Sequence, residues 1–494
     1  MSRESSKMSN YATTTGDDFF SYCYLSLKRG YSSVKNWWNS LQNSDERQFE
    51  RILFTNLLIG ITVAFTLAYY NHSLELTEAE NASMDWNMQV NQNIIAPIAD
   101  TNIPSFVMLD IDEGTYQAWD EPLQISRKRL MYLIKAAVEA KASMVIVNLD
   151  ISQPMPVEGS GLHPDDQALK NYLANYGTNC SSQKDQSACP TIILRQTFST
   201  AKRNAPILRA TFLDKVVAEG APYLQWASTQ INPASNDLVV RQQQLWQSAY
   251  TAQEQATVIP SIELLAMGII QEARGRTDCV SEMDNELSPF SPLNNAIPSP
   301  TLSSSFLNLC GLTLRSAHTP DHFPRIMYRM AWVIDDKPPE LPYLITDDDD
   351  VPALMIFPAE PYAQSQPQAS LKVMADSIVV IGSSYREARE VYDTPLGDMP
   401  SSLILLNALY SLLDKDNAPI EPSPVLDILF TLIFITLLSV LFDFFFSFLG
   451  IVGSSLGILF ILLPLLLLFS GYGSWFTFAL PLILIGIYQG IRIE

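Results

Sequence analysis

The chain has 494 residues, which is enough for one large domain or two ordinary ones together with membrane segments. Lys and Arg number 31 against 52 Asp and Glu, which gives a formal net charge of −21. So acidic a chain is a poor match for nucleic acid or for docking on anionic lipid, and the surface of an ordinary acidic domain accounts for the charge.

A first membrane helix is predicted at residues 52–70, after a cytoplasmic N-terminal segment at 1–51. This run is apolar and uncharged, and at about 1.5 Å per residue it can cross a hydrocarbon core about 30 Å thick. Five Lys and Arg residues lie between positions 28 and 51, and none occurs from 71 to 100. The positive-inside rule therefore predicts a cytoplasmic N-terminus and an external domain after the helix.

The external domain opens with a polar stretch at 71–102, which is predicted to be a helical stalk packed on the domain. Residues 105–112 and 143–150 are predicted strands, and a helix is expected between them at 126–140, with Ser126 as its N-cap. Because neither strand has a polar face, we expect a parallel βαβ unit that is covered on both sides.

The middle of the domain gives weaker signals. The predicted elements, in chain order, are an irregular insertion at 154–189, a strand at 191–196, a hairpin at 222–241, a helix at 258–270, a loop-rich insertion at 274–319 and a strand at 326–332.

The domain closes with residues 371–413, around which the chain is organised. A β-branched strand is predicted at 377–381, and Gly382, Ser383 and Ser384 are expected to end it in a turn. A polar loop, Asp393-Thr394-Pro395-Leu396-Gly397, then leads to an amphipathic helix at 401–413.

Three more membrane helices are predicted at 425–442, 444–469 and 475–490, after an external domain that spans 71–423. Three crossings that start outside place the C-terminus in the cytoplasm, so that four membrane helices are expected in total.

The closing stretch carries a family resemblance. Its segments VVIGSS, DTPLG and MPSS-LILLNAL resemble the closing motif of the second type of CHASE domain, roughly VxIGxxxxxxxDxxxTPxGxxxPGVxxHANxLxxLL. The opening of the domain is also similar, with Asp110, Asp112 and Asp150 at the acidic strand ends of the family pattern. Of the family's WPWxR motif only Pro122 and Arg127 remain.

The resemblance implies an α/β extracytoplasmic sensor domain with a mixed, largely parallel sheet and flanking helices, followed by three membrane helices. The protein is then expected in a bacterial inner (plasma) membrane, with both termini cytoplasmic and the large domain periplasmic. Family members usually carry a cytoplasmic kinase or cyclase domain. Since Glu494 follows directly on the last predicted span, we expect a separate protein to supply the output.

Two hypotheses for function follow. In the first, the domain senses an envelope signal and relays it through the bilayer to a separate cytoplasmic, membrane or envelope protein. In the second, the protein is a structural or assembly subunit of an envelope complex and uses the CHASE fold as a docking scaffold. Replacement of the family's Gly and His by Ser401 and Leu405 favours the second. Both allow homo-oligomers, for which no sharp motif is present.

Strand-end acids are the candidate ligand-binding residues. Ligands of open α/β sheets bind outside the carboxyl ends of the strands, where Asp110, Asp112 and Asp150 are expected, and Asp393 and Thr394 could face the same crevice. The alternative is that these residues cap helices and fix turns.

No catalytic motif accompanies these acids: the chain has no P-loop, no HExxH and no GxSxG. We expect neither enzymatic activity nor a cofactor, and a hydrolase using the strand-end acids is the least favoured interpretation. The acidic run at 346–350 offers hard oxygens for Ca²⁺, but without spaced ligands it is better interpreted as a solvated loop, so no metal site is predicted.

Four of the five cysteines fall in the external domain, and Cys23 is expected to be a cytoplasmic free thiol. An even number in an oxidising compartment predicts disulfides, and among three connectivities we favour the local pairs Cys180–Cys189 and Cys279–Cys310. Zinc binding is the weaker alternative because no CxxC spacing is present.

Overall fold

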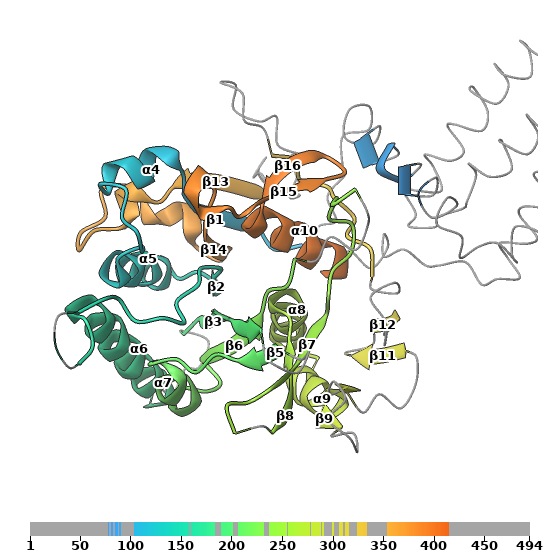
Figure 1. Cartoon of the computed structure of the whole chain (residues 1–494), viewed down its shortest axis with the longest axis horizontal. Coiled ribbons are helices and arrows are strands. Elements are labelled where there is room, and N and C mark those ends of the chain that lie inside the picture. Colours follow the sequence, from blue (N-terminus) through green and yellow to red (C-terminus); the bar gives the residue numbers. More distant parts are fainter. Residues whose placement is uncertain are drawn as a thin grey trace, which may run out of the picture. The chain divides into compact units, whose positions relative to one another are not determined.

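The computed structural model of the chain describes most of residues 103–413 (Figure 1). The gaps in this range are residues 158, 160, 183–188, 201–205, 232–236, 254, 277, 288, 291–298, 301–305, 310–311, 316–323 and 333–352, and before it only residues 78, 81, 82, 84–86, 88 and 89 are described. The chain divides into two compact units, and nearly all described residues belong to the unit formed by Met84–Ile420 and Gly471–Ser474.

All four predicted membrane spans lie outside the described residues, as do Cys23, Cys310 and the acidic run at 346–350. Within the part of the chain that is described, no helix is both long enough and apolar enough to cross a membrane.

A six-stranded parallel sheet forms the centre of the domain. In spatial order its strands are β13 (Leu354–Pro358), β1 (Phe106–Ile111), β14 (Ile378–Ser383), β2 (Met144–Val147), β3 (Thr191–Gln196) and β6 (Leu224–Ser228). Every residue of β1, β14 and β2 is buried, as continuous apolar runs require when a sheet is covered on both faces. The prediction of an α/β domain with a largely parallel sheet is confirmed.

The expected βαβ unit is present with one change. Helix α5 (Arg127–Glu139) begins after Ser126, whose Oγ accepts a hydrogen bond from the Arg129 amide at 3.4 Å. The strands β1 and β2 are parallel but not neighbours, because β14 from the far end of the domain lies between them.

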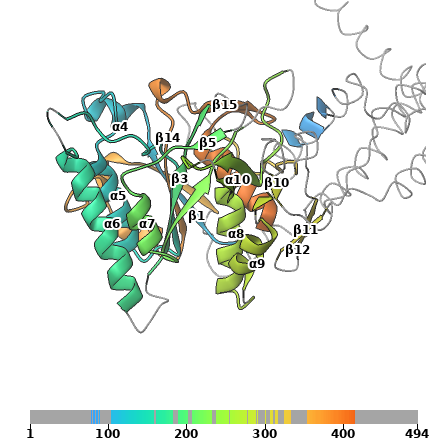
Figure 2. The ribbon, with the colours of Figure 1, turned by 60° about the horizontal axis from the view of Figure 1, so that its bottom comes forward.

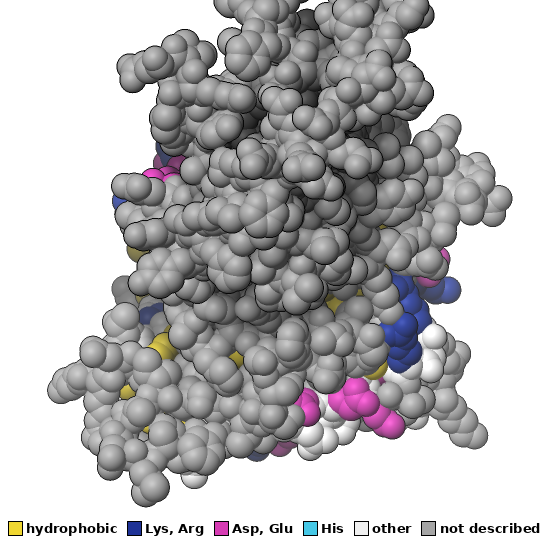
Figure 3. All heavy atoms as spheres, turned by 90° about the vertical axis from the view of Figure 1, so that its right-hand side faces the viewer, with side chains coloured by type: hydrophobic (Ala, Val, Ile, Leu, Met, Phe, Trp, Pro, Cys, Tyr) yellow, Lys and Arg dark blue, Asp and Glu magenta, His cyan; other side chains and the backbone are white. Residues whose placement is uncertain are grey.

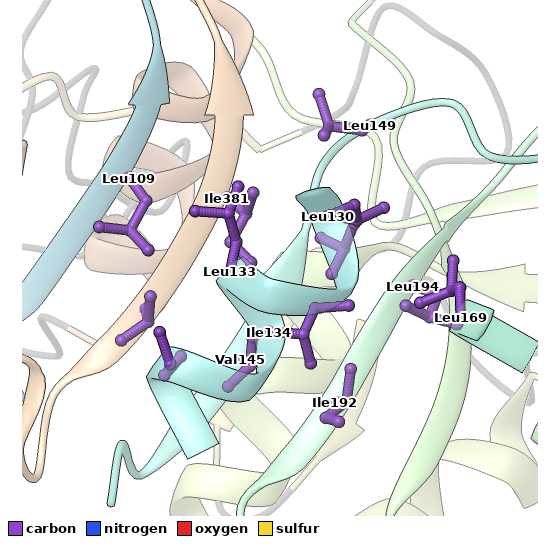
Figure 4. Packing of buried hydrophobic residues seen from close by; sticks show 14 of the residues in the cluster. Leu109, Leu130, Leu133, Ile134, Val145, Leu149, Leu169, Ile192, Leu194 and Ile381 are labelled. Atoms are coloured by element: carbon purple, nitrogen blue, oxygen red, sulfur yellow. The ribbon is translucent and has the colours of Figure 1, made fainter. Parts of the chain in front are cut away.

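Helices cover both faces of the sheet (Figure 2). On one side are α5, α6 (Pro164–Ser182) and α7 (Asp214–Glu219), and on the other are α8 (Ile262–Ala273), α9 (Cys279–Glu286) and α10 (Ser401–Leu413). Figure 4 shows how Leu130, Leu133 and Ile134 of α5 pack against strand residues, which include Leu109, Val145 and Ile381. Because successive side chains of a strand point to opposite faces of the sheet, the hydrophobic core has one layer on each face.

Smaller elements surround this core. A second sheet contains, in order, β4 (Phe198–Thr200), β5 (Pro206–Leu208), β7 (Trp246–Tyr250) and β8 (Ala256–Pro260). Three strand pairs join β9 (Pro289–Phe290) to β10 (Ser299–Pro300), β11 (Phe306–Leu309) to β12 (Leu312–Arg315) and β15 (Val391–Thr394) to β16 (Gly397–Pro400). Short helices are α4 (Glu113–Ala118), η3 (Glu360–Tyr362), η4 (Leu371–Met374) and η5 (Arg386–Ala388).

The predicted irregular insertion at 154–189 is wrong, because α6 occupies most of it. Pro164, Asp165 and Asp166 lie in its first turn, where a proline and acids are favoured. Leu169 and Leu173 are fully buried one turn apart. The helix signal was therefore present, but polar residues on its outer side masked it.

Three other predictions need correction. The stretch at 222–241 is not a hairpin, since β6 joins the central sheet beside β3 and the hairpin of this region is β7–β8. Residues 326–332 are not a strand, and only one isolated bridge, Gln242 to Arg325, lies next to them. The loop-rich insertion at 274–319 contains α9 and the short strands β9 to β12.

The closing stretch also differs in detail. β14 continues through Ser383 instead of ending at Ile381, and α10 has the predicted bounds but is buried at every position rather than amphipathic. Its sequence has no charged residue, so no side of the helix favours water.

Candidate functional site

Asp110 is the one strand-end acid that lies in the interior. It is 3 % exposed, and its Oδ2 accepts a hydrogen bond from the Ser384 hydroxyl at 2.5 Å. Its Oδ1 is buried and has no partner among the described residues. Burial raises the pKa of Asp110 to about 7, the hydrogen bonds from the side chain and the backbone of Ser384 work against this rise, and the nearby Asp112 charge adds to it. Asp110 therefore takes up a proton in a pH range where other aspartates are ionised.

Asp112 and Asp150 have local structural roles. Asp112 is the N-cap of α4, and its Oδ1 accepts a hydrogen bond from the Thr115 amide at 2.7 Å. Asp150 Oδ1 accepts one from the Ser152 amide at 2.9 Å. Both arrangements match the alternative expectation that Asp residues cap helices and fix turns.

Asp393 and Thr394 lie on the β15–β16 hairpin. The Thr394 hydroxyl donates to the Gly397 carbonyl at 2.6 Å and accepts from the Leu396 amide at 3.2 Å, which closes the turn. Asp393 faces Asp398 across the hairpin, and a hydrogen bond between the two carboxyl groups raises the pKa of Asp393.

The candidates do not converge on a cation site. Within the described ranges, no group of three or more His, Cys, Asp and Glu side chains is placed to hold a metal ion. Ligand binding by Asp110, Asp112, Asp150, Asp393 and Thr394 stays a prediction.

The structure instead reveals a polar joint between α10 and the sheet, formed by Asn148, Gly382, Ser401 and Ser402, none of which was a candidate site residue. Asn148 follows β2 and is 1 % exposed, and its Nδ2 donates to the hydroxyls of Ser401 and Ser402, each at 3.1 Å. A Cβ at Gly382 would lie 1.8 Å from Ser402 Oγ, so only glycine permits this approach of helix and strand. Ser401, which replaces the family's glycine, has a direct role here through its hydroxyl.

Further along α10, Asn407 joins the helix to residues 324–330, which we call the coupling segment. Asn407 Oδ1 accepts hydrogen bonds from the amides of Arg329 and Met330 at 2.8 and 2.9 Å, and its Nδ2 donates to the Met330 carbonyl at 3.0 Å. The Ser411 hydroxyl accepts from the Met327 amide at 2.8 Å. Asn407 stands at the asparagine of the family's closing motif, a signal that could have identified it.

The coupling segment also contacts the stalk. The described stalk residues 84–86, 88 and 89 are helical, in agreement with the prediction. Asp85 forms ion pairs with Arg325 at 2.9 Å and with Arg241 at 2.7 Å. Arg241 also forms an ion pair with Asp237 at 2.6 Å. Burial alone would lower the pKa of Arg241, but the hydrogen bonds to Asp237 and Asp85 raise it overall.

The stalk reaches the closing hairpin as well, because Gln89 Nε2 donates to the Pro395 carbonyl at 2.9 Å. Although the chain is acidic overall, the ion pairs around Asp85 bring basic and acidic side chains together locally. Figure 3 shows basic and acidic described side chains near one another on one face.

Arg127, the remaining basic residue of the family's opening motif, supports the segment after β2. It is buried and donates to the carbonyls of Asp150 and Gln153 at 3.3 and 3.2 Å. Its Nε lies 3.8 Å from Asp166, which in turn accepts a hydrogen bond from the Met155 amide at 2.7 Å. Burial lowers the pKa of Arg127, and the charges of Asp166 and Asp150 oppose that change.

The predicted disulfide Cys180–Cys189 is confirmed, with a Cα–Cα distance of 5.9 Å. It connects the C-terminal turn of α6 to the residues just before β3. Cys279 is also disulfide-bonded, while Cys310, its expected partner, lies outside the described residues.

Comparison with protein families gives one match: the model of the CHASE2 domain matches residues 59–441. A search of curated proteins and a search of solved structures each returned no match. The matched range covers well over half of the chain, including the strand-end acids, the polar joint and the coupling segment. The chain therefore belongs to the CHASE2 domain family, a family of sensory domains.

Proposed function

We propose that this protein is a bacterial inner-membrane sensor whose periplasmic domain receives an envelope signal and relays it to a separate protein. Membership of a sensory family supports the first half of this proposal. The observation that carries the second half is that the coupling segment contacts both the stalk and α10.

These two elements are the chain's connections to its predicted membrane helices. The stalk follows the predicted span at 52–70, and α10 precedes the one at 425–442. Arg325 holds the stalk through Asp85, and within five residues the amides of Met327, Arg329 and Met330 bind α10. A displacement of either connection is thus passed to the other through one short segment.

The contacts are strong enough for this role. Asp85 and Arg325 are largely buried, and hydrogen bonds to charged groups contribute about 1.5–3 kcal/mol each. Asn407 is fully buried and makes three hydrogen bonds to the coupling segment, at about 1 kcal/mol each. Movement of the stalk against α10 must break one of these sets.

The test is a pull-down of the full-length protein from its native membranes in mild detergent, with partners identified and quantified by mass spectrometry. We expect a kinase, cyclase or regulator at a near-equal ratio. We also expect Arg325→Met, which removes the ion pair between the coupling segment and Asp85 of the stalk, to change the recovered ratio several-fold. Lys215→Met is the matched control, since the ion pair of Lys215 with Glu219 on α7 is exposed. Recovery of the protein alone, or equal effects of both variants, would refute the relay.

The alternative is a structural or assembly subunit of an envelope complex. It is supported by the positions at which the chain departs from the family's motif: the Ser401 hydroxyl binds Asn148 and Leu405 is buried, so both now serve packing. Stoichiometric recovery of envelope-complex components in the same experiment would favour this function over sensing. In neither case do we expect catalysis or a cofactor.

A further inference from the structure

Residues 384–400, which we call the strap, connect β14 to α10 along the carboxyl edge of the central sheet. The strap contains η5 and the β15–β16 hairpin. It is fastened by the Ser384 hydroxyl on Asp110 at 2.5 Å, by Glu390 on Arg195 of β3 at 2.9 Å, and by the Val240 amide on the Asp393 carbonyl at 2.8 Å. The first of these contacts along the chain, the hydrogen bond from Ser384, is therefore made to a buried acid, Asp110.

The beginning of the strap lies directly over β1 and α4. The amides of Ser384 and Tyr385 donate to the Ile111 carbonyl at 3.2 and 3.3 Å. The Tyr385 ring stacks on Tyr116 with centroids 4.1 Å apart, and the Arg386 amide donates to Glu113 at 3.2 Å. These contacts hold the beginning of the strap beside the end of β1, where Asp110 is 3 % exposed.

The charged side chains near Asp110 and the beginning of the strap are mostly negative. The charge of Asp112, after β1, acts on Asp110, and the charges of Glu113, Glu121 and Glu387 act on Tyr116. Arg386 on η5 is a basic residue of the strap. The other titratable side chains on the packed elements are Tyr116, Tyr385 and Tyr410, while β13, β14 and α10 contribute no charged residue. In the described part of the chain, no Lys or Arg forms an ion pair with Asp110.

We propose that the strap is a proton-controlled cover, which is seated while Asp110 is neutral and is released from β1 and α4 when Asp110 ionises. The physical reason is that an ionised carboxylate without a counterion is costly in the interior, and the hydrogen bonds from the side chain and the backbone of Ser384 compensate for only part of that cost. Lifting the strap admits water to the carboxylate. The inference rests on the sensory function proposed above and gives it a signal, the proton concentration outside the membrane.

The strap can pass this change on. Its hairpin holds the stalk through the Pro395 carbonyl and Gln89, and its last residue adjoins α10. Ser401, the first residue of α10, donates its amide to the Glu390 carbonyl at 2.7 Å. Release at Asp110 thus alters the same two connections that the coupling segment joins.

The experiment is hydrogen–deuterium exchange with mass spectrometry on the full-length protein in nanodiscs, at pH 5.5 and pH 8. Wild type is compared with Asp110→Asn at each pH, so that intrinsic exchange rates cancel. With a pKa of about 7, the ionised form of Asp110 outnumbers the neutral form about tenfold at pH 8. Because lifting the strap returns this carboxyl to water, where its pKa is 3.8, we expect wild-type strap amides to exchange at least tenfold faster than those of the variant at pH 8. This excess should be much smaller at pH 5.5.

Glu263 provides the matched control. It is a second buried acid, on α8, whose pKa burial raises to about 7, and its hydrogen bonds run to its own backbone and to Ser261. Glu263→Gln should leave strap exchange unchanged. Equal strap exchange in wild type and Asp110→Asn at pH 8, or the same effect from Glu263→Gln, would overturn the proposal.

A second variant keeps the test decisive if Asp110→Asn folds poorly. Ser384→Ala leaves the carboxylate in place and removes the hydrogen bond that lowers its pKa, so the pH midpoint of strap exchange should move upward. An unmoved midpoint would also overturn the proposal. Because strap exchange needs no partner, a pull-down without a partner would refute the relay and leave this result standing.

Discussion

Gly382→Ala is the sharpest test of how α10 is fixed to the sheet. The new methyl group would lie 1.8 Å from Ser402 Oγ and 2.7 Å from Ser402 Cβ. The hydroxyl can rotate away, but the Cβ is fixed to the helix backbone. Since carbon atoms pack at about 3.5–4.0 Å, α10 must retreat by about 1 Å.

The cost follows from what that retreat breaks. Forcing a methyl group into a packed site costs about 1–3 kcal/mol. The retreat also separates Ser401 and Ser402 from Asn148, which is fully buried and loses both acceptors of its amide at about 1–3 kcal/mol. We expect Gly382→Ala to lower the free energy of unfolding by about 3–5 kcal/mol.

The companion variant Ser402→Gly removes both clashing atoms. Alone it should cost about 2 kcal/mol, from one hydrogen bond and from glycine in a helix. The double variant should be more stable than Gly382→Ala by about 1–3 kcal/mol, because the methyl group then has space. Pulse proteolysis of the full-length protein in urea measures all three. Additive effects in this cycle would refute the close contact of Gly382 with Ser402.

Three further predictions use the same assay. Asn407→Leu should lower the free energy of unfolding by about 2–4 kcal/mol, because it leaves buried amides of the coupling segment without acceptors; a change below about 1 kcal/mol would contradict the bonds described. Asp110→Asn should stabilise the protein at pH 8 by up to about 4 kcal/mol, because burial raises the pKa from 3.8 to about 7 and each tenfold change in proton affinity corresponds to about 1.4 kcal/mol. The raised pKa means that the folded state holds the proton more tightly, so this gain must shrink as the pH falls from 7 towards 4; a gain independent of pH would contradict it. Replacing Cys180 and Cys189 together by Ser should cost about 2–3 kcal/mol under oxidising conditions, as expected for a short loop, and an unchanged urea midpoint would show that the bond adds nothing.

The elements predicted well share one property: their signals are local. β1, β3 and α5 follow from apolar runs and from a serine cap, and α10 was placed with its correct bounds. α6 was missed although Leu169 and Leu173 keep helical spacing, because the residues between them are polar. The strand order could not be predicted, since apolar pattern does not distinguish β14 from β2 as the neighbour of β1.

The same holds for the candidate site: residues with a local signal were identified from the sequence, but contacts between residues far apart in the chain were not. Asp110 was found because it ends a strand, but its partner Ser384 is 274 residues away. Asp85 and Arg241 are 156 residues apart and Asn148 and Ser401 are 253 apart, so one sequence without relatives holds no sign that they meet. Asp112 was also identified, but its function is to cap α4, as the plainer interpretation expected.

The position of β14 has a consequence for how the chain is made. Ser105 and Ser377, which hydrogen-bond to each other beside β1 and β14, are 272 residues apart, and β14 separates β1 from β2. During synthesis the inner edges of both strands stay unpaired until nearly the whole domain has been made, and unpaired edges invite aggregation. Any chain interrupted before residue 378 would keep those edges open. Proteases and chaperones can then detect such an incomplete chain by the unpaired edges of β1 and β2, and no dedicated signal is needed.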